Sequence, residues 1–244
     1  MGPNKVLLVN RRIVVAVLLA LPALAQVPAT SAPPITPSQL SGSVRDETGS
    51  GVEAFVTIQT QGLQQQGLTA PDGTFQFPNL KAGKYIVCAK ATERNAKPTD
   101  EPYVDSCLWH DSSTLQLTLA RGENHSGAVV PLQHGSLLTV HVNDPAEQLP
   151  AAAGRIGGND LSIQIVGASS LIQHVPITAL AANGRDHTIV IPYGVPHHLI
   201  VHSSTFSLND ASGLALTNSQ QPTIVAVRGG PPPSVVVNVG PRKP

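Results

Sequence analysis

Charged and aromatic residues are scarce in this chain. Of its 244 residues, Lys, Arg, Asp and Glu make up 12% and Phe, Trp and Tyr 3%, with one Trp and one Met. A nucleic-acid-binding protein carries a basic stripe, whereas the 15 basic residues here are balanced by 15 acidic ones. No nucleic-acid partner is therefore expected. The apolar content is mainly Val, Leu, Ile and Ala, which can fill a core but supplies few large contact residues.

The chain also lacks an apolar run long enough to span a membrane. Residues 13–21 form an apolar run of about nine residues, where a spanning helix needs about 20. Lys5, Arg11 and Arg12 precede this run and Ala23-Leu24-Ala25 follows it, which is typical of a secretory signal at residues 1–25. We expect an exported protein (periplasmic, cell-surface or extracellular) with no membrane span in the mature chain; an uncleaved anchor is the alternative.

Cysteine is limited to Cys88 and Cys107. An even count in an exported chain favours a disulfide over a metal or redox pair. Two free thiols are the alternative.

Period-two patterning begins after a segment rich in Pro, Ser, Thr and Ala at residues 26–39, which we interpret as a linker. Short alternating runs bounded by Gly, Pro, Asn and Asp predict strands with one buried face. The residues expected to face the core are Val52, Ala54, Val56, Ile58, Phe75, Phe77, Tyr85, Val87, Ala89, Leu115, Leu117 and Leu119. Asp72-Gly73 predicts a hairpin turn between two of these runs. No segment of the mature chain keeps a helical period, so the fold class is all-β.

The segment from Leu40 to Lys90 resembles the carboxypeptidase regulatory-like domain family. The positions that carry the resemblance are Gly42, Val44, Asp46, Ala54, Val56, Asp72, Gly73, Phe75, Phe77, Leu80, Gly83, Tyr85 and Val87. The resemblance implies a small transthyretin-like (prealbumin-like) antiparallel β-sandwich at 40–134, with two further strands at 114–119 and 127–132. It implies no catalytic residues and no cofactor.

A weaker internal echo of this pattern follows. Residues 135–144 repeat the opening strand, and residues 189–201 parallel the stretch that ends at Lys90. Strands at 223–227 and 234–239 parallel the two that close the first unit. The sequence therefore predicts a second sandwich of the same kind at 135–244, although it has no Asp-Gly turn.

The histidines are the first candidates for chemistry. His197, His198 and His202 are clustered, but a metal ion needs ligands at about 2.0–2.1 Å. If Leu199 points into the core, His198 and His202 share the outer face about 13 Å apart, and His197 faces the other way. We interpret the histidines, His141 included, as surface side chains and expect no metal site.

The insertion at residues 92–113 departs from the family pattern. It contains Tyr103, Cys107, Trp109 and His110, with four acids that we expect to be solvated caps. Long ordered loops are often functional, and Tyr103, Trp109 and His110 are the candidate contact surface. The alternative is that Trp109 merely covers the sheet against which a Cys88–Cys107 bond would hold the loop.

No G-x-S-x-G motif or pair of facing carboxylates indicates catalysis, so we do not expect an enzyme. The first hypothesis is a binding or interaction module of the cell envelope or extracellular space, with an envelope protein or a polysaccharide as partner. The alternatives are a purely structural spacer, and a carbohydrate-binding accessory to a hydrolase on another chain.

Overall fold

The computed structural model describes residues 36–92, 101–109, 114–149, 160–167, 172–181, 183–217 and 221–243. The expected signal peptide and most of the expected linker lie outside these ranges. Within them the chain forms sixteen strands and one helix of four residues, which confirms the all-β expectation. No helix in the described ranges is long and apolar enough to cross a membrane.

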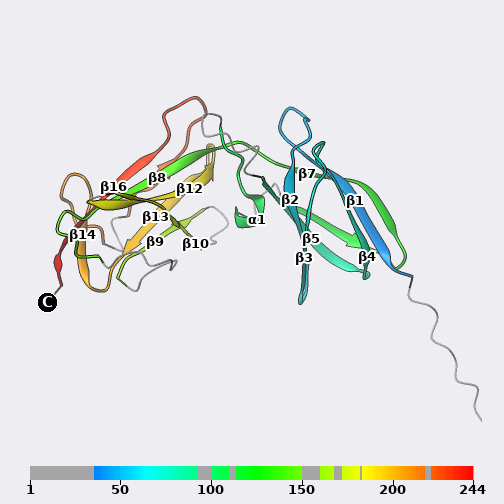
Figure 1. Ribbon diagram of the computed structural model, residues 1–244, viewed down its shortest axis with the longest axis horizontal. Coiled ribbons are helices and arrows are strands. Elements are labelled where there is room, and N and C mark those ends of the chain that lie inside the picture. The colour runs from blue at the N-terminus through cyan, green and yellow to red at the C-terminus, as the bar shows by residue number, and fades with distance from the viewer. Residues whose placement is uncertain are drawn as a thin grey trace, which may run out of the picture. The chain divides into compact units, whose positions relative to one another are not determined.

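The N-terminal strands form two facing sheets around one hydrophobic core (Figure 1). One sheet has the order β4-β1-β7 and the other β3-β2-β5-β6. Their bounds are β1 Ser38–Arg45, β2 Ala54–Thr60, β3 Leu63–Leu68, β4 Thr74–Leu80, β5 Gly83–Ala91, β6 Leu115–Leu119 and β7 Asn124–Pro131. The alternation is confirmed, since Val56, Val87 and Leu119 are buried between the sheets with the other expected core residues, while Leu115 and Leu117 are partly buried. Because β1 starts at Ser38, it begins inside the segment expected to be linker.

The C-terminal strands form a second pair of sheets with its own core. The orders are β11-β12-β8-β16-β14 and β10-β9-β13-β15. The bounds are β8 Gly135–Asn143, β9 Ser162–Val166, β10 Ile172–His174, β11 Ile177–Ala181, β12 Gly184–Pro192, β13 Pro196–His202, β14 Phe206–Asn209, β15 Thr223–Val225 and β16 Ser234–Arg242.

The two sandwiches repeat one topology, as the sequence echo predicts. The order β4-β1-β7 recurs as β12-β8-β16, and β3-β2-β5-β6 recurs as β10-β9-β13-β15. In each copy the first strand pairs in parallel with the last, β1 with β7 and β8 with β16, while the other pairs are antiparallel. Strands β11 and β14 are additions at the edges of the second copy. The sandwich expectation is confirmed, and the parallel pairs are a feature that alternation alone does not reveal.

The hairpin predicted at Asp72-Gly73 is wrong. This turn leads from β3 to β4, which belong to different sheets, so it crosses between the layers. Asp72 Oδ1 accepts hydrogen bonds from the backbone and hydroxyl of Thr74, and Gly73 has φ of 82° while its carbonyl accepts from the N–H of Val44. The true hairpin joins β2 to β3 through Gln61-Gly62. A turn signal indicates that the chain reverses but not which strand lies beside which.

Candidate functional site

The insertion begins as an attachment to the first sandwich, through the one-turn helix α1 (Ser106–Trp109). Ala89 lies beyond the part of β5 that pairs with β6, and its backbone N–H and carbonyl bond to a side chain instead. Its N–H donates to Ser106 Oγ at 2.8 Å, and this hydroxyl donates back to the Ala89 carbonyl at 3.1 Å. Cys107 is disulfide-bonded to Cys88, with Cα atoms 4.9 Å apart, so the pairing favoured by the cysteine count is confirmed.

Asp105 caps the helix, as expected of an acid in this loop. Its Oδ1 accepts the backbone N–H groups of Cys107 and Leu108 at 3.0 and 3.2 Å. The N-terminal end of α1 is therefore capped by Asp105 and held on the first sandwich by a side-chain bridge to β5 and a covalent bond.

The other end of the insertion enters the second sandwich. Trp109 is only 2% exposed, belongs to the second core and donates its indole N–H to the Val190 carbonyl at 3.0 Å. Its ring lies edge-on to that of His197, with centroids 4.9 Å apart. Gln173 donates to the Leu108 carbonyl at 2.6 Å. We call residues 101–109 the clamp, because they are joined to both sandwiches.

The prediction that Trp109 forms a contact surface is therefore wrong. The alternative was also incomplete, because the indole packs into the second core rather than over the sheet of the first. Its burial follows from chemistry, since a large apolar ring with one donor is stabilised where that donor meets a backbone carbonyl. His110 lies outside the described residues.

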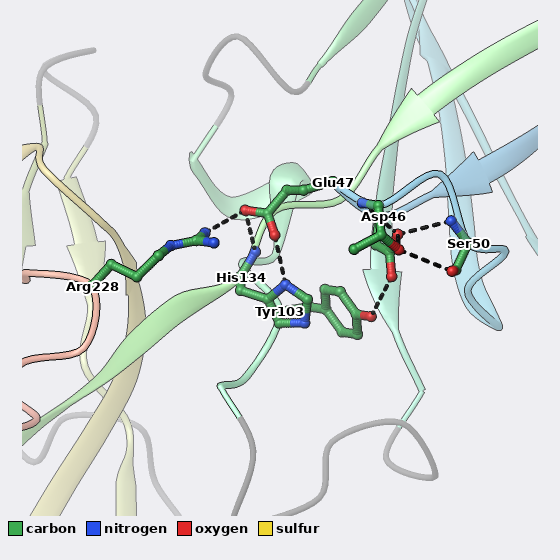
Figure 2. Close-up of polar contacts among 7 residues, drawn as sticks. Asp46, Glu47, Ser50, Tyr103, His134 and Arg228 are labelled. Carbon is green, nitrogen blue, oxygen red and sulfur yellow. Dashed lines mark hydrogen bonds and ion pairs between the residues drawn. The ribbon is translucent and has the colours of Figure 1, made fainter.

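Tyr103 belongs to a polar cluster that also joins the two sandwiches (Figure 2). Its ring stacks on His134, with centroids 4.2 Å apart, and its hydroxyl lies 3.4 Å from Asp46 Oδ2. Glu47, in the β1–β2 loop, accepts from Nδ1 of His134 at 2.7 Å and from Arg228 of the β15–β16 loop at 2.6 Å. Tyr103 is partly buried, so it contributes to this internal cluster more than to an open surface.

The electrostatics of the cluster favour the charged form of Glu47. Burial opposes ionisation, but hydrogen bonds from His134 and Arg228 and the charge of Arg228 lower the pKa of Glu47 below its ordinary value. Burial and the neighbouring Asp46 raise the pKa of Tyr103. The lowered pKa of Glu47 and the raised pKa of Tyr103 together describe an ion pair beside a neutral phenol. This arrangement suits a structural link and not an acid–base pair.

The histidines divide into two groups. His198 and His202 are exposed on the outer face of β13, and His141 lies on the outer face of β8, 2.5 Å from Asp186. The surface interpretation is wrong for His197 and His187, which are 1% and 6% exposed. Their Nδ1 atoms meet the carbonyls of Val195 and Val175, and burial lowers the pKa of both. No cluster of three or more His, Cys, Asp or Glu able to hold a metal occurs among the described residues.

A partly uncovered face of the first sandwich is the remaining candidate site. Thr57 and Cys88 are buried where α1 is attached to it, whereas Phe55 and Gln59 on either side of Thr57 are exposed. On the outer face of β3-β2-β5-β6, the strand registers align Gln64 beside Gln59, Gln59 beside Ile86 and Ile86 beside Gln116. We call these four residues the glutamine row. The three glutamines are exposed and Ile86 is partly buried. Since neighbouring strands lie about 4.8 Å apart, the row crosses the whole sheet over about 14 Å.

Two open hollows lie on this face. The first, about 680 Å³, is lined by three members of the glutamine row (Gln59, Ile86 and Gln116) with Thr60, Lys84 and Thr118 among others. The second, about 650 Å³, is lined by Phe55, Gln66, Leu68, Lys90 and Thr92 among others. The Thr92 hydroxyl is buried without a hydrogen-bond partner in the described part of the chain. Sequence reasoning missed this face because β3, Leu63–Leu68, carries glutamines at 64, 65 and 66 on both of its faces; the alternation of β2 and β6 was the available signal.

No family model matches the chain, and no curated protein matches it. Solved structures match it at low identity. The Bacillus anthracis TIE protein is 14% identical over 84% of this chain and 34% of its own, with a TM-score of 0.33. The Streptococcal ancillary pilin is 10% identical over 85% of this chain and 63% of its own, with a TM-score of 0.32.

A DUF3823 family protein from Bacteroides ovatus is 13% identical over 78% of this chain and 99% of its own, with a TM-score of 0.29. The present chain spans about a third of the length of the Bacillus protein. These likenesses concern the fold of β proteins alone. The resemblance to the carboxypeptidase regulatory-like family stays a prediction.

Proposed function

We propose that this protein is an exported, non-catalytic binding module of the cell envelope or extracellular space, built from two transthyretin-like sandwiches of the carboxypeptidase regulatory-like type. The observation that carries the proposal is the outer face of β3-β2-β5-β6. Away from the attachment of α1 this face is exposed, hollowed in two places and rich in hydrogen-bonding groups. A disulfide that links two elements of an exported chain agrees with the expected compartment.

The clamp supports a role in presentation rather than in chemistry. Its Trp109 is engaged with the second sandwich, while Ser106 and Cys107 hold it to the first. Contacts that order a binding face before its ligand arrives lower the entropy cost of binding.

The test is capture of envelope components by the full mature chain. Wild type is compared with Gln59→Arg, which places a long charged side chain over the first hollow. We expect wild type to retain a component that the variant loses. Equal retention by both would move the site away from this face, and hydrolysis of peptides or glycans by the purified chain would contradict the proposal.

A second candidate function is a structural spacer, because the clamp joins the two sandwiches to each other. A spacer needs rigidity but no ligand. If wild type retains no envelope component while Trp109→Ala changes the scattering profile of the chain in solution, the spacer replaces the binding module.

A further inference from the structure

We infer that the glutamine row and its flanking hollows bind an uncharged polysaccharide. This inference rests on the proposed function and names the ligand class and the residues of that same face. The groups offered at the first hollow are the carboxamides of Gln59 and Gln116 and the hydroxyls of Thr60 and Thr118. Each of these side chains both donates and accepts hydrogen bonds. Sugar hydroxyls also donate and accept, so a carbohydrate can pair with the hydrogen-bonding groups of these four side chains.

The charges on this face favour a neutral ligand. The charged residues that line the two hollows are Lys84 at the first, and Lys90 and Glu53 at the second. The ammonium of Lys90 lies 4.0 Å from Asp105 of the clamp, which offsets its charge. An anionic polymer would meet no arginine fork and no cationic stripe among the lining residues, so electrostatic steering toward this face is weak.

The apolar residues on the face fit a carbohydrate better than a protein. Phe55 is 41% and Leu68 55% exposed at the second hollow, and Ile86 lies between the two glutamines at the first. They offer modest apolar area against which the C–H surface of a sugar ring can pack. Protein–protein interfaces concentrate their binding energy in Trp, Tyr and Arg, and none of these is exposed at either hollow: Tyr85, which borders the first, is buried.

The geometry fits a chain rather than a single sugar. The first hollow lies at Gln59 and the second at Phe55, four residues along β2 and therefore about 13 Å apart at 3.3 Å per residue. Thr57 and Cys88 are buried between the two hollows, at the disulfide to α1, so an extended polymer that occupies both hollows passes beside this attachment. Thr92 is among the residues that line the second hollow, and its hydroxyl is buried without a partner among the described residues.

The second sandwich supplies a matched control. Gln164 of β9 lies beside Ile200 of β13, as Gln59 of β2 lies beside Ile86 of β5, because the two sandwiches share one strand order. The amide of Gln164 already donates to Ser162 at 3.2 Å. Substitution of Gln164 therefore removes the same side chain from the equivalent strand without touching the glutamine row.

The experiment is affinity gel electrophoresis of the full mature chain in gels cast with neutral polysaccharides (dextran, a β-glucan, a mannan and a galactan) or with carboxymethyl-dextran. We expect retardation in at least one neutral gel. The double variant Gln59→Ala/Gln116→Ala should weaken it roughly tenfold, as the loss of two hydrogen-bonding side chains implies. Gln164→Ala should leave it unchanged. Exposed substitutions of this kind have little effect on folding, and thermal melting of each variant verifies this.

Each other outcome overturns the inference in a distinct way. If the double variant is retarded by a neutral polysaccharide as strongly as wild type, the polysaccharide does not bind at this face, and the proposed function still stands. Stronger retardation in carboxymethyl-dextran than in dextran would overturn the preference for neutral ligands. If no neutral polysaccharide retards the wild type, the ligand class is wrong, and the envelope capture described above decides separately whether the protein binds anything.

Discussion

Removal of the Cys88–Cys107 bond should weaken the attachment of Trp109 to the second sandwich as well as the first sandwich itself. The two cysteines are 19 residues apart in the sequence, and closing a loop of that length stabilises by about 3 kcal/mol in the chain-entropy model. If this loss of stability reaches the second sandwich through α1, the unfolding midpoint reported by Trp109 should fall as well. With a urea m-value of roughly 2 kcal/mol per M, a loss of about 3 kcal/mol lowers the midpoint by about 1.5 M.

Trp109 makes the measurement direct, because it is the one tryptophan of the chain and is buried. Urea unfolding of Cys88→Ala/Cys107→Ala is followed by tryptophan emission and, in parallel, by circular dichroism. Because a chain with two cores need not unfold in two states, the two midpoints are compared rather than a single free energy. A reducing agent should lower the midpoint of wild type and have no effect on the double variant.

The coupling would be refuted by a tryptophan midpoint that stays within about 0.3 M of wild type while the circular dichroism midpoint falls. That result would mean that α1 remains in the second core without its attachment to the first. Trp109→Phe tests the same contact from the other side. It keeps an aromatic ring but loses the hydrogen bond to Val190, and should cost about 1 kcal/mol or more.

Two further predictions concern the folded state. Burial lowers the pKa of His187 and His197 below 6.5, so the unfolded chain binds more protons than the native one at mildly acidic pH. The stability contributed by the two neutral histidines should be fully present above pH 6.5 and fall as the pH drops toward their native pKa values. Melting temperatures at pH 7.5 and 5.5 test this. The double variant His187→Asn/His197→Asn should show a smaller difference between these two melting temperatures than wild type. Gly73→Ala should destabilise the first sandwich by about 3 kcal/mol or more, because φ is 82° and the new Cβ would lie 2.4 Å from the Val44 carbonyl oxygen. Gly62→Ala, with φ of 76° and nothing within 4 Å, should cost only about 1 kcal/mol in urea unfolding, and equal losses in the two variants would contradict this explanation.

The sequence predicts most of the strands because one face of each is buried. Val56, Val87 and Leu119 alternate with polar residues, and all three are in the core. Pairing is a different matter. Nothing in the sequence near Asp72-Gly73 shows that β4 will lie beside β1 instead of β3, because sheet order depends on contacts between residues far apart. Strand β3 was missed because it is an edge strand, and Gly67 leaves space for the ring of Phe77, 3.3 Å from where a Cβ would lie.

The candidate site shows the same division between local and distant information. The disulfide followed from composition and compartment. The destination of Trp109 did not, because the carbonyl of Val190 that accepts its N–H lies 81 residues away. His197 looked like part of a surface cluster because it precedes His198, yet strand alternation places it on the buried face with Leu199. The alternation that sets His197 opposite His198 also predicts that His197 is buried, and the surface interpretation left this consequence out.

The internal repeat allows the outer faces of the two sandwiches to be compared as candidate binding faces, because one chain carries two versions of the same sheet. The row Gln64–Gln59–Ile86 of the first sandwich becomes His174–Gln164–Ile200 in the second. The hollows of the first face are lined by no imidazole, whereas His198 also lies on the outer face of the second sheet. Histidine is the side chain that titrates near neutral pH. A neutral polysaccharide held by the glutamine row should therefore bind equally between pH 5.5 and 8, and binding that changes steeply over this range would assign the ligand to the second copy.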